Sequence, residues 1–252
     1  MIPAPARRWL LLDLGNTRLK WAWATDGRLG AVAAVAHDRT GWLQEAGADW
    51  DAGPEPQRIL LAAVAAPAAV DALRAALARR FAGIEVERLA SPAHAGEWRS
   101  AYAEPARLGV DRYLAMRGAM ALQPGAVLVA GCGTAVAIDL VDAQGLHRGG
   151  LIAPGPALMR ESILGRTGRV GWQREGQVLA FGAGTEDALQ SGCWQAAAAL
   201  VGRALSVATR ELGVAPPLFL HGGDAEPLAQ LLDPGARIVP ALVFEGMLRH
   251  AR

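Results

Sequence analysis

A strand that runs into a glycine-containing turn and then returns occurs twice in this chain, and this repetition restricts the fold more than any other feature. In the first copy, an apolar run at residues 9–12 leads into Asp13-Leu14-Gly15-Asn16-Thr17-Arg18-Leu19-Lys20 and on to a return strand ending near residue 24. In the second copy, residues 126–130 lead into Gly131-Cys132-Gly133-Thr134, and residues 135–141 return. We therefore expect a duplicated α/β protein.

The segments after each hairpin also correspond between the two halves. An apolar strand follows at 31–36 in one half and at 149–153 in the other, and further strands at 58–64 and 217–223 each precede a helix. Helices are expected near 67–81, 107–121, 157–164, 185–212, 225–232 and 241–250. We predict two similar domains of mixed sheet with flanking helices, residues 1–120 and 121–252, with a cleft between them. The alanine-rich segment 185–212 serves either a dimer contact or domain packing.

The first hairpin has the chemistry of a phosphate site. Its turn places backbone N–H groups and short polar side chains at one tip, where a polyphosphate can bind. Asp13 stands beside the turn and can approach a divalent metal directly or through water. Lys20 is the only lysine in the sequence, so this position favours a compact point charge over the guanidinium used elsewhere. The alternative is an ordinary hairpin with an Asn-Thr turn.

Charge and cysteine content restrict the class of protein. The net charge of +1 gives no support to a nucleic-acid or anionic-membrane partner. Cys132 and Cys193 lack metal-ligand spacing and suggest no disulfide, which fits a reducing cytoplasm. Asp13 interrupts the first apolar run too early for a signal peptide, and the longest apolar stretch, 59–70, is too short to span a bilayer. We expect a cytoplasmic protein without nucleic-acid or membrane partners.

An ordered set of short motifs resembles one family. The set consists of Asp-x-Gly-Asn-Thr-x-x-Lys at 13–20, Gly109-Val110-Asp111-Arg112, Gly133-Thr134-Ala135, Gly149-Gly150-x-Ile152-x-Pro154-Gly155, Thr185-Glu186-Asp187-Ala188 and Gly222-Gly223. In order and spacing it resembles the type III pantothenate kinases, which belong to the superfamily of sugar kinases, heat-shock chaperones and actin. The resemblance runs from Asp13 to the end of the chain and implies two ribonuclease H-like domains of the actin-like ATPase type.

The resemblance implies an activity and an acceptor site. The activity is ATP-dependent phosphorylation of pantothenate to 4′-phosphopantothenate, the first step of coenzyme A biosynthesis, by a homodimer. In the family, the aspartate that matches Asp111 is the catalytic base, and the arginine that matches Arg112 contacts the pantothenate carboxylate. Tyr102 and Thr185 match residues of the substrate pocket, with Gly109 and Val110 beside them. From the residues alone, Asp111 could equally be an acid in the first turn of a helix, Tyr102 a packing residue, and Thr185 an N-cap.

The resemblance also implies a nucleotide site. The expected ATP-binding residues are Asp13, Leu14, Gly15, Asn16, Thr17, Arg18, Leu19, Lys20, Gly133, Thr134, Gly222 and Gly223, with Asp13 near magnesium. Many members carry an aspartate that ligates a monovalent cation, usually potassium, where this chain has Gly131. Dependence on potassium or ammonium is therefore left open. His37, His94 and His147 form no metal set, and His221 reads as a packed or loop histidine.

Two other classes of protein remain alternatives. One is a kinase or phosphatase of the same superfamily that acts on another small hydroxyl substrate. The other is a regulatory or accessory protein that keeps the kinase fold without its activity. The presence of Asp13, Lys20, Asp111 and Arg112 argues against the second alternative, because a scaffold does not need all four.

Overall fold

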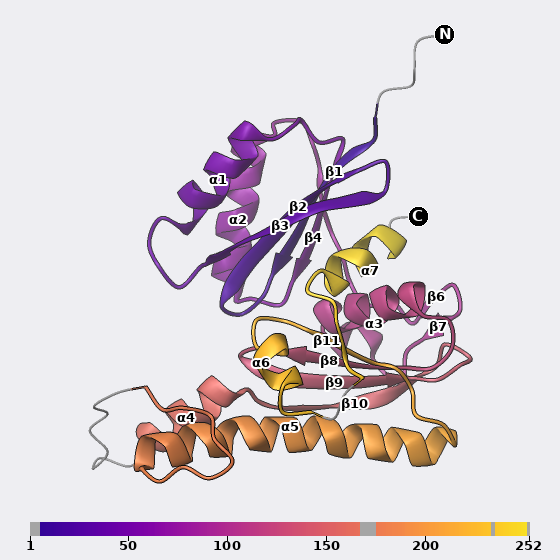
Figure 1. The fold of residues 1–252 in the computed structure, drawn as a ribbon. Coiled ribbons are helices and arrows are strands. Elements are labelled where there is room, and N and C mark those ends of the chain that lie inside the picture. Colours follow the sequence, from indigo (N-terminus) through magenta and orange to yellow (C-terminus); the bar gives the residue numbers. More distant parts are fainter. Residues whose placement is uncertain (1–5, 167–174, 233–234, 251–252) are drawn as a thin grey trace. The chain divides into compact units, whose positions relative to one another are not determined.

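The computed structural model describes residues 6–166, 175–232 and 235–250. Its internal contacts divide the chain into two compact units. The first comprises Met1–Ala95, Tyr102–Ala121 and Ala241–Arg252, and the second Gly96–Ala101 and Leu122–Pro240. Each unit contains one five-stranded sheet (Figure 1).

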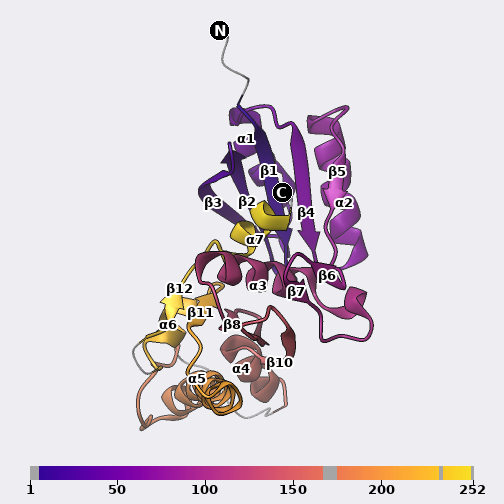
Figure 2. The same cartoon turned by 90° about the vertical axis from the view of Figure 1, so that its right-hand side faces the viewer.

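The first sheet has the strand order β3-β2-β1-β4-β5. Its strands are β1 (Arg8–Leu14), β2 (Arg18–Thr25), β3 (Arg28–Ala36), β4 (Arg58–Ala63) and β5 (Val86–Arg88). The β1-β2-β3 meander is antiparallel, whereas β4 runs parallel to β1, and β5 parallel to β4. Helices α1 (Trp42–Ala52) and α2 (Pro67–Arg80) cover one face, and α7 (Leu242–His250) packs on β1 from the other (Figure 2). The first unit also contains the 3₁₀ turn η1 (Pro105–Arg107) and all but the last residue of α3 (Val110–Leu122).

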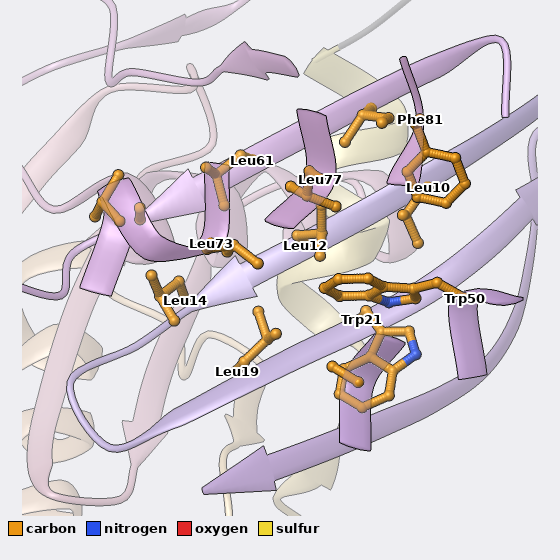
Figure 3. Close-up of a cluster of buried hydrophobic side chains, with 14 of the residues drawn as sticks. Leu10, Leu12, Leu14, Leu19, Trp21, Trp50, Leu61, Leu73, Leu77 and Phe81 are labelled. Atoms are coloured by element: carbon orange, nitrogen blue, oxygen red, sulfur yellow. The ribbon is translucent and has the colours of Figure 1, made fainter. Parts of the chain in front are cut away.

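Alternation along β1 and β2 places two sets of side chains on opposite faces of this sheet. Leu10, Leu12 and Leu14 point into a buried cluster with α1 and α2 (Figure 3). Trp21 and Trp50 meet there edge to face, with ring centroids 6.1 Å apart. Each large side chain buried in this way stabilises the fold by about 1.5–3 kcal/mol. Because successive strand residues point to opposite faces, Asp13 and Lys20 lie on the face that carries α7.

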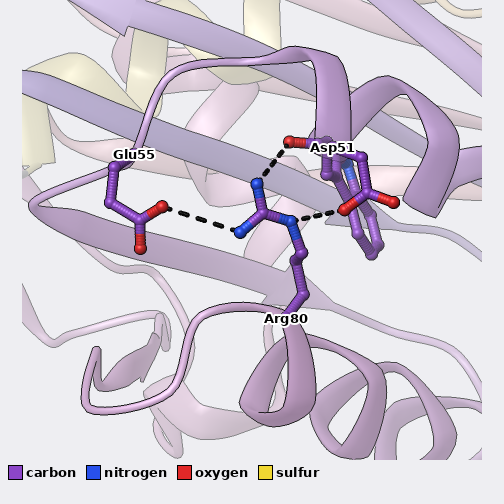
Figure 4. Close-up of polar contacts among 4 residues, drawn as sticks. Asp51, Glu55 and Arg80 are labelled. Carbon is purple, nitrogen blue, oxygen red and sulfur yellow. Dashed lines mark hydrogen bonds and ion pairs between the residues drawn. The ribbon is translucent and has the colours of Figure 1, made fainter.

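Arg80 at the end of α2 fastens this helix to the end of α1. Its guanidinium lies 2.5 Å from Asp51 Oδ1 and 3.6 Å from Glu55 Oε2, and it donates to the Trp50 carbonyl at 3.3 Å (Figure 4). The same group lies 4.6 Å from the centroid of the Phe81 ring. Several shared partners make this network worth more than an isolated surface ion pair.

The second sheet repeats the topology of the first, with the order β10-β9-β8-β11-β12. Its strands are β8 (Val127–Cys132), β9 (Ala135–Val141), β10 (His147–Pro154), β11 (Leu218–His221) and β12 (Arg237–Ile238). The long helix α5 (Thr185–Leu212) buries alanines and Val201 against β8, β9 and β11. Helices α4 (Pro156–Leu164) and α6 (Ala225–Ala229) both contact α5. Two short strands, β6 (His94–Ala95) and β7 (Trp98–Arg99), follow β5 along the chain.

The expected duplication is confirmed, because both sheets share one strand order. Helix α1 was not predicted, since its segment has a weak apolar period and contains Gly47. Residues 107–109 do not belong to α3, which begins at Val110, and α6 ends at Ala229 rather than at 232. Helix α7 packs within the first unit, although the predicted boundary grouped residues 241–252 with the second half.

Cys132 and Cys193 are buried free thiols. Among the described residues, no helix has both the length and the apolar character needed to cross a membrane.

Candidate active site

Three ionisable groups of the first unit, Asp13, Lys20 and Asp111, interact near the end of β1. Asp13 near the end of β1 pairs directly with Lys20 on β2. Burial raises the pKa of Asp13 to about 7, Lys20 opposes that rise, and the charge of Asp111 adds to it. The structure thus brings the predicted metal-side carboxylate, the single lysine and the predicted catalytic carboxylate within electrostatic reach of one another.

The predicted ATP-binding residues of the first hairpin fall into two groups, one exposed at the turn and one buried beside it. Gly15 N–H donates to the Arg18 carbonyl at 3.0 Å and closes the turn. Asn16, Thr17 and Arg18 are exposed at its tip. Leu14 and Leu19 are fully buried in the core, so a ligand can meet only their main chain.

The start of α3 explains why glycine precedes the candidate base. The Gly109 carbonyl accepts a hydrogen bond from Tyr113 N–H at 3.1 Å, so Asp111 lies in the first helical turn. A Cβ atom at position 109 would stand 2.6 Å from Asp111 Oδ1, so a larger residue there would displace the carboxylate. Val110 is buried, which leaves its backbone as the group that a substrate can contact. The helix N-terminus favours the ionised form of a carboxylate placed there.

Arg112 and Tyr102 form a pair beside this carboxylate. Arg112 Nη1 donates to Tyr102 Oη at 3.1 Å, and the guanidinium carbon lies 5.9 Å from the ring centroid. Both residues are half-buried. The contact orients a planar guanidinium, whose geometry suits a carboxylate ligand.

In the second unit, the two predicted glycine turns follow neighbouring parallel strands. The register of β8 and β11 ends with Gly131 opposite His221, so the turns at Gly133-Thr134 and Gly222-Gly223 share one sheet edge. Gly222 has a φ of 100°, and a Cβ atom on it would stand 2.1 Å from the Cys132 carbonyl oxygen. Such close approach requires glycine. Thr134 is exposed, and its carbonyl accepts from Gly155 N–H at 2.9 Å.

The ring of His221 occupies the space beside Gly131, the position at which many family members carry a cation ligand. A Cβ atom at Gly131 would lie 2.9 Å from His221 Nε2 and 3.1 Å from His221 Cε1. An aspartate at this place would need His221 to move. The residues present therefore do not fit a monovalent-cation site built on a side chain at position 131.

Thr185 is the first residue of α5, and Gly184 is its N-cap. The interpretation of Thr185 as the N-cap is therefore wrong by one residue. Thr185 is exposed and belongs to the second unit, whereas Tyr102, Asp111 and Arg112 belong to the first.

Sequence reasoning assigned no role to His147 and His37, which both have defined contacts in the structure. His147 is completely buried, with Nε2 2.9 Å from Asp139 Oδ1, and its ring stacks on Trp98. His37 contacts the first hairpin turn, with Nε2 2.8 Å from the Gly15 carbonyl oxygen. The strand expected at 31–36 could have indicated this contact, because a third antiparallel strand ends beside the first hairpin turn and His37 directly follows it.

No group of three or more histidines, cysteines or acids able to hold a metal occurs in the part of the chain that the structure describes. The surroundings of Asp13 nevertheless fit magnesium. Burial and Asp111 both oppose ionisation of this carboxylate, and a divalent cation would relieve that cost. Magnesium keeps several waters and needs only one or two carboxylates beside substrate phosphates.

Comparison with known proteins identifies the family to which the chain is similar. The family model described as type III pantothenate kinase matches residues 9–206. A type III pantothenate kinase of Xanthomonas oryzae pv. oryzae (strain PXO99A) is 44% identical over 241 residues, which cover 96% of each chain. A solved Sinorhizobium meliloti protein described as a 2-dehydro-3-deoxygalactonokinase aligns with a TM-score of 0.56 at 14% identity, covering 97% of this chain and 98% of its own. A solved Campylobacter jejuni protein described as a Baf family transcriptional activator aligns with a TM-score of 0.54 at 22% identity, covering 94% of each chain. These two structures support the fold alone.

Proposed function

This chain belongs to the type III pantothenate kinase family, and we propose that its Asp111 is the general base in the phosphorylation of pantothenate by ATP. The chain is a kinase of coenzyme A biosynthesis, and its product is 4′-phosphopantothenate. The observation that carries the role of Asp111 is its place in the first turn of α3, within electrostatic reach of Asp13 and beside the Arg112–Tyr102 pair.

In the proposed mechanism, the Asp111 carboxylate accepts the proton of the primary hydroxyl of pantothenate. The freed oxygen bonds to the γ-phosphorus of ATP as the bond between that phosphorus and the bridging oxygen to the β-phosphate breaks. ADP leaves with the bonding electrons. Most of the rate gain in such transfers comes from positioning and charge stabilisation, which suits a site built from a few fixed charges.

We propose that Arg112 holds the carboxylate of pantothenate, oriented by its hydrogen bond to Tyr102. Tyr102, Gly109, Val110 and Thr185 complete the acceptor pocket in this proposal. Gly109 leaves the room in which Asp111 Oδ1 can face the hydroxyl. A two-pronged arginine contact would fix both the distance and the rotation of the acceptor.

For the nucleotide, we propose that the turn at residues 15–17 and Lys20 meet the phosphates of ATP. Gly133-Thr134 would contact a second part of the nucleotide, and Gly222-Gly223 the adenosine side. Asp13 would hold magnesium through one oxygen or a bound water, and the ion would neutralise phosphate charge when bound. Lys20 adds a positive charge on the same sheet face.

We further propose that the protein is cytoplasmic, acts without nucleic-acid or membrane partners, and works as a homodimer. Exposed apolar side chains of the second unit support the dimer, among them Ile152 on β10, Ile163 on α4 and Phe181, which is 95% exposed. Size-exclusion chromatography coupled to light scattering would measure the mass of the protein in solution. A monomer at micromolar concentration would contradict the dimer.

The proposed reaction is tested directly by product formation. Purified protein is incubated with magnesium, ATP and pantothenate under several monovalent salts, and 4′-phosphopantothenate is measured by mass spectrometry together with ADP. We expect both products in equal amounts. ADP release with inorganic phosphate but without 4′-phosphopantothenate would mean that water accepts the phosphoryl group, and would contradict pantothenate as the acceptor.

A further inference from the structure

His37 touches the candidate phosphate turn at two points. Its ring Nε2 lies 2.8 Å from the Gly15 carbonyl oxygen, and its backbone N–H donates to the Thr17 carbonyl at 3.0 Å. A carbonyl oxygen only accepts hydrogen bonds, so Nε2 must carry the hydrogen. One residue thus holds the carbonyl groups on both sides of Asn16.

This double contact determines which way the turn presents its donors. In a trans peptide, the carbonyl oxygen and the following N–H point in opposite directions, and the described residues contain no cis bond. With the Gly15 carbonyl held toward His37, the Asn16 N–H must point away from it. The Gly15 N–H is already bonded to the Arg18 carbonyl, so Asn16 supplies a donor at the exposed tip.

The imidazole is itself held in place by packing. Its ring centroid lies 5.7 Å from that of Trp42, the first residue of α1, at an angle of 53°. Gly41, with a φ of 87°, turns the chain between His37 and this tryptophan. The position of the ring is therefore fixed by the third strand and the first helix, and both are rooted in the core.

We propose that His37 is a positioning residue of the nucleotide site. It fixes the peptide between Gly15 and Asn16, so that the turn meets the phosphates of ATP without having to reorient. This inference rests on the proposed assignment of the 15–17 turn to ATP. Neither the hydrogen-bond role nor the ring contact of His37 follows from the family motif at residues 13–20.

Two substitutions separate the donor from the ring. His37→Phe keeps an aromatic ring against Trp42 and removes the hydrogen bond to Gly15, whereas His37→Gln keeps an N–H donor of similar reach. Both retain the backbone bond to Thr17. We expect His37→Phe to raise the KM for ATP roughly threefold to tenfold, the factor that corresponds to one net hydrogen bond. His37→Gln should restore it largely, and the KM for pantothenate should change in neither variant.

The experiment uses steady-state kinetics with each substrate varied, calorimetric binding of a non-hydrolysable ATP analogue, and thermal unfolding of every variant. His94→Phe, at an exposed histidine, is the matched control. Equal rises in both KM values, or no change in the KM for ATP, would overturn the positioning role. Lys20→Met tests whether the first hairpin binds ATP at all, independently of the role of His37. If it weakens analogue binding and His37→Phe does not, only the role of His37 fails. If neither does, the turn is not the nucleotide site.

Discussion

At the scale of single residues, the candidate site contains two carboxylates, Asp13 and Asp111, whose negative charges repel each other. Burial and Asp111 together raise the pKa of Asp13, while Lys20 acts against them. The two acids thus have different environments, since Asp13 is 8% exposed and Asp111 is half-buried at a helix start. Different environments allow two groups of one chemical type to take different roles, one near a cation and one near a proton.

The first prediction concerns the base. Asp111→Asn keeps the size and the helix position of the side chain but cannot accept the hydroxyl proton, so kcat should fall roughly a hundredfold or more. Thermal unfolding should change little. The control is Asp71→Asn, at an exposed position of α2. Turnover near that of the wild type in Asp111→Asn would place the base at another residue.

The second prediction concerns the acceptor anchor. Arg112→Lys keeps the positive charge but loses the planar fork and the hydrogen bond to Tyr102. The KM for pantothenate should therefore rise at least tenfold, while the KM for ATP changes less than twofold, if the fork contributes on the order of 1.5–3 kcal/mol as charged hydrogen bonds do. Initial rates with each substrate varied measure both constants. Parallel rises would show that Arg112 orders the site as a whole.

At the scale of elements, helices α3 and α7 cross with their backbones in contact. A Cβ atom at Gly246 would lie 1.9 Å from the Leu114 carbonyl oxygen, and one at Gly118 would lie 2.2 Å from that of Leu242. No flexible side chain can yield at either place, because both obstacles are backbone atoms. The C-terminal helix thus supports the helix whose first turn carries Asp111.

The third prediction uses this crossing. Gly246→Ala should lower the free energy of unfolding by about 1–3 kcal/mol, the usual cost of overpacking, and should also lower kcat because α3 must shift. Gly192→Ala in α5 is the matched control, since a Cβ atom there meets nothing within 4 Å. That variant should be neutral or more stable by roughly 0.5–1 kcal/mol. Urea unfolding measures both, and equal effects would contradict the close crossing.

The fourth prediction concerns the far end of α7. His250 Nδ1 lies 3.0 Å from Tyr113 Oη, and burial, Arg117 and Arg58 lower the pKa of His250 although Glu87 opposes them. The unfolded chain, with the ordinary pKa of 6.5, then binds the proton more tightly than the folded protein does. The free energy of unfolding should therefore fall as the pH drops below about 6.5, and level off below the folded-state pKa.

His250→Phe keeps the edge-on ring contact with Tyr113 and removes the titrating group. Its unfolding free energy should depend less on pH between about 7.5 and 5.5 than that of the wild type, as urea titrations at each pH would measure. His94→Phe, at an exposed histidine, serves as control and should leave the slope unchanged. An unchanged slope in His250→Phe would assign the pH dependence to other groups.

The sequence predicted the parts of this fold that depend on local pattern. The hairpins, the long helix and the order of the apolar strands follow from strand alternation and glycine turns, and the structure has them. The packing of α7 on α3 could not be predicted, because it depends on Gly118 and Gly246 meeting backbone atoms far away in the chain. The same holds for His221, whose place opposite Gly131 requires the register of two strands that are distant in sequence.

At the scale of the whole molecule, the two halves share a topology but not a charge pattern. At equivalent registers, Asp13 pairs with Lys20 on β2, whereas Gly131 pairs with Ala137 on β9. On the other side, Asp13 pairs with Ala62 and Gly131 with His221. Duplication therefore gave two similar sheets, of which the first keeps a carboxylate and an ammonium, while the second places a histidine beside a glycine.

The fifth prediction follows from this asymmetry. Since His221 fills the space into which a side chain at position 131 would extend, the cation site that many relatives build there has neither its ligand nor its room. Activity should therefore be nearly equal in sodium, potassium, ammonium and bulky organic-cation buffers at matched ionic strength. Gly131→Asp alone should clash with His221, whereas Gly131→Asp with His221→Ala restores both carboxylate and space. A potassium response in the double variant alone would support this account. Strong, saturable activation of the unmodified enzyme by potassium would contradict it, and would mean that backbone carbonyls rebuild the site.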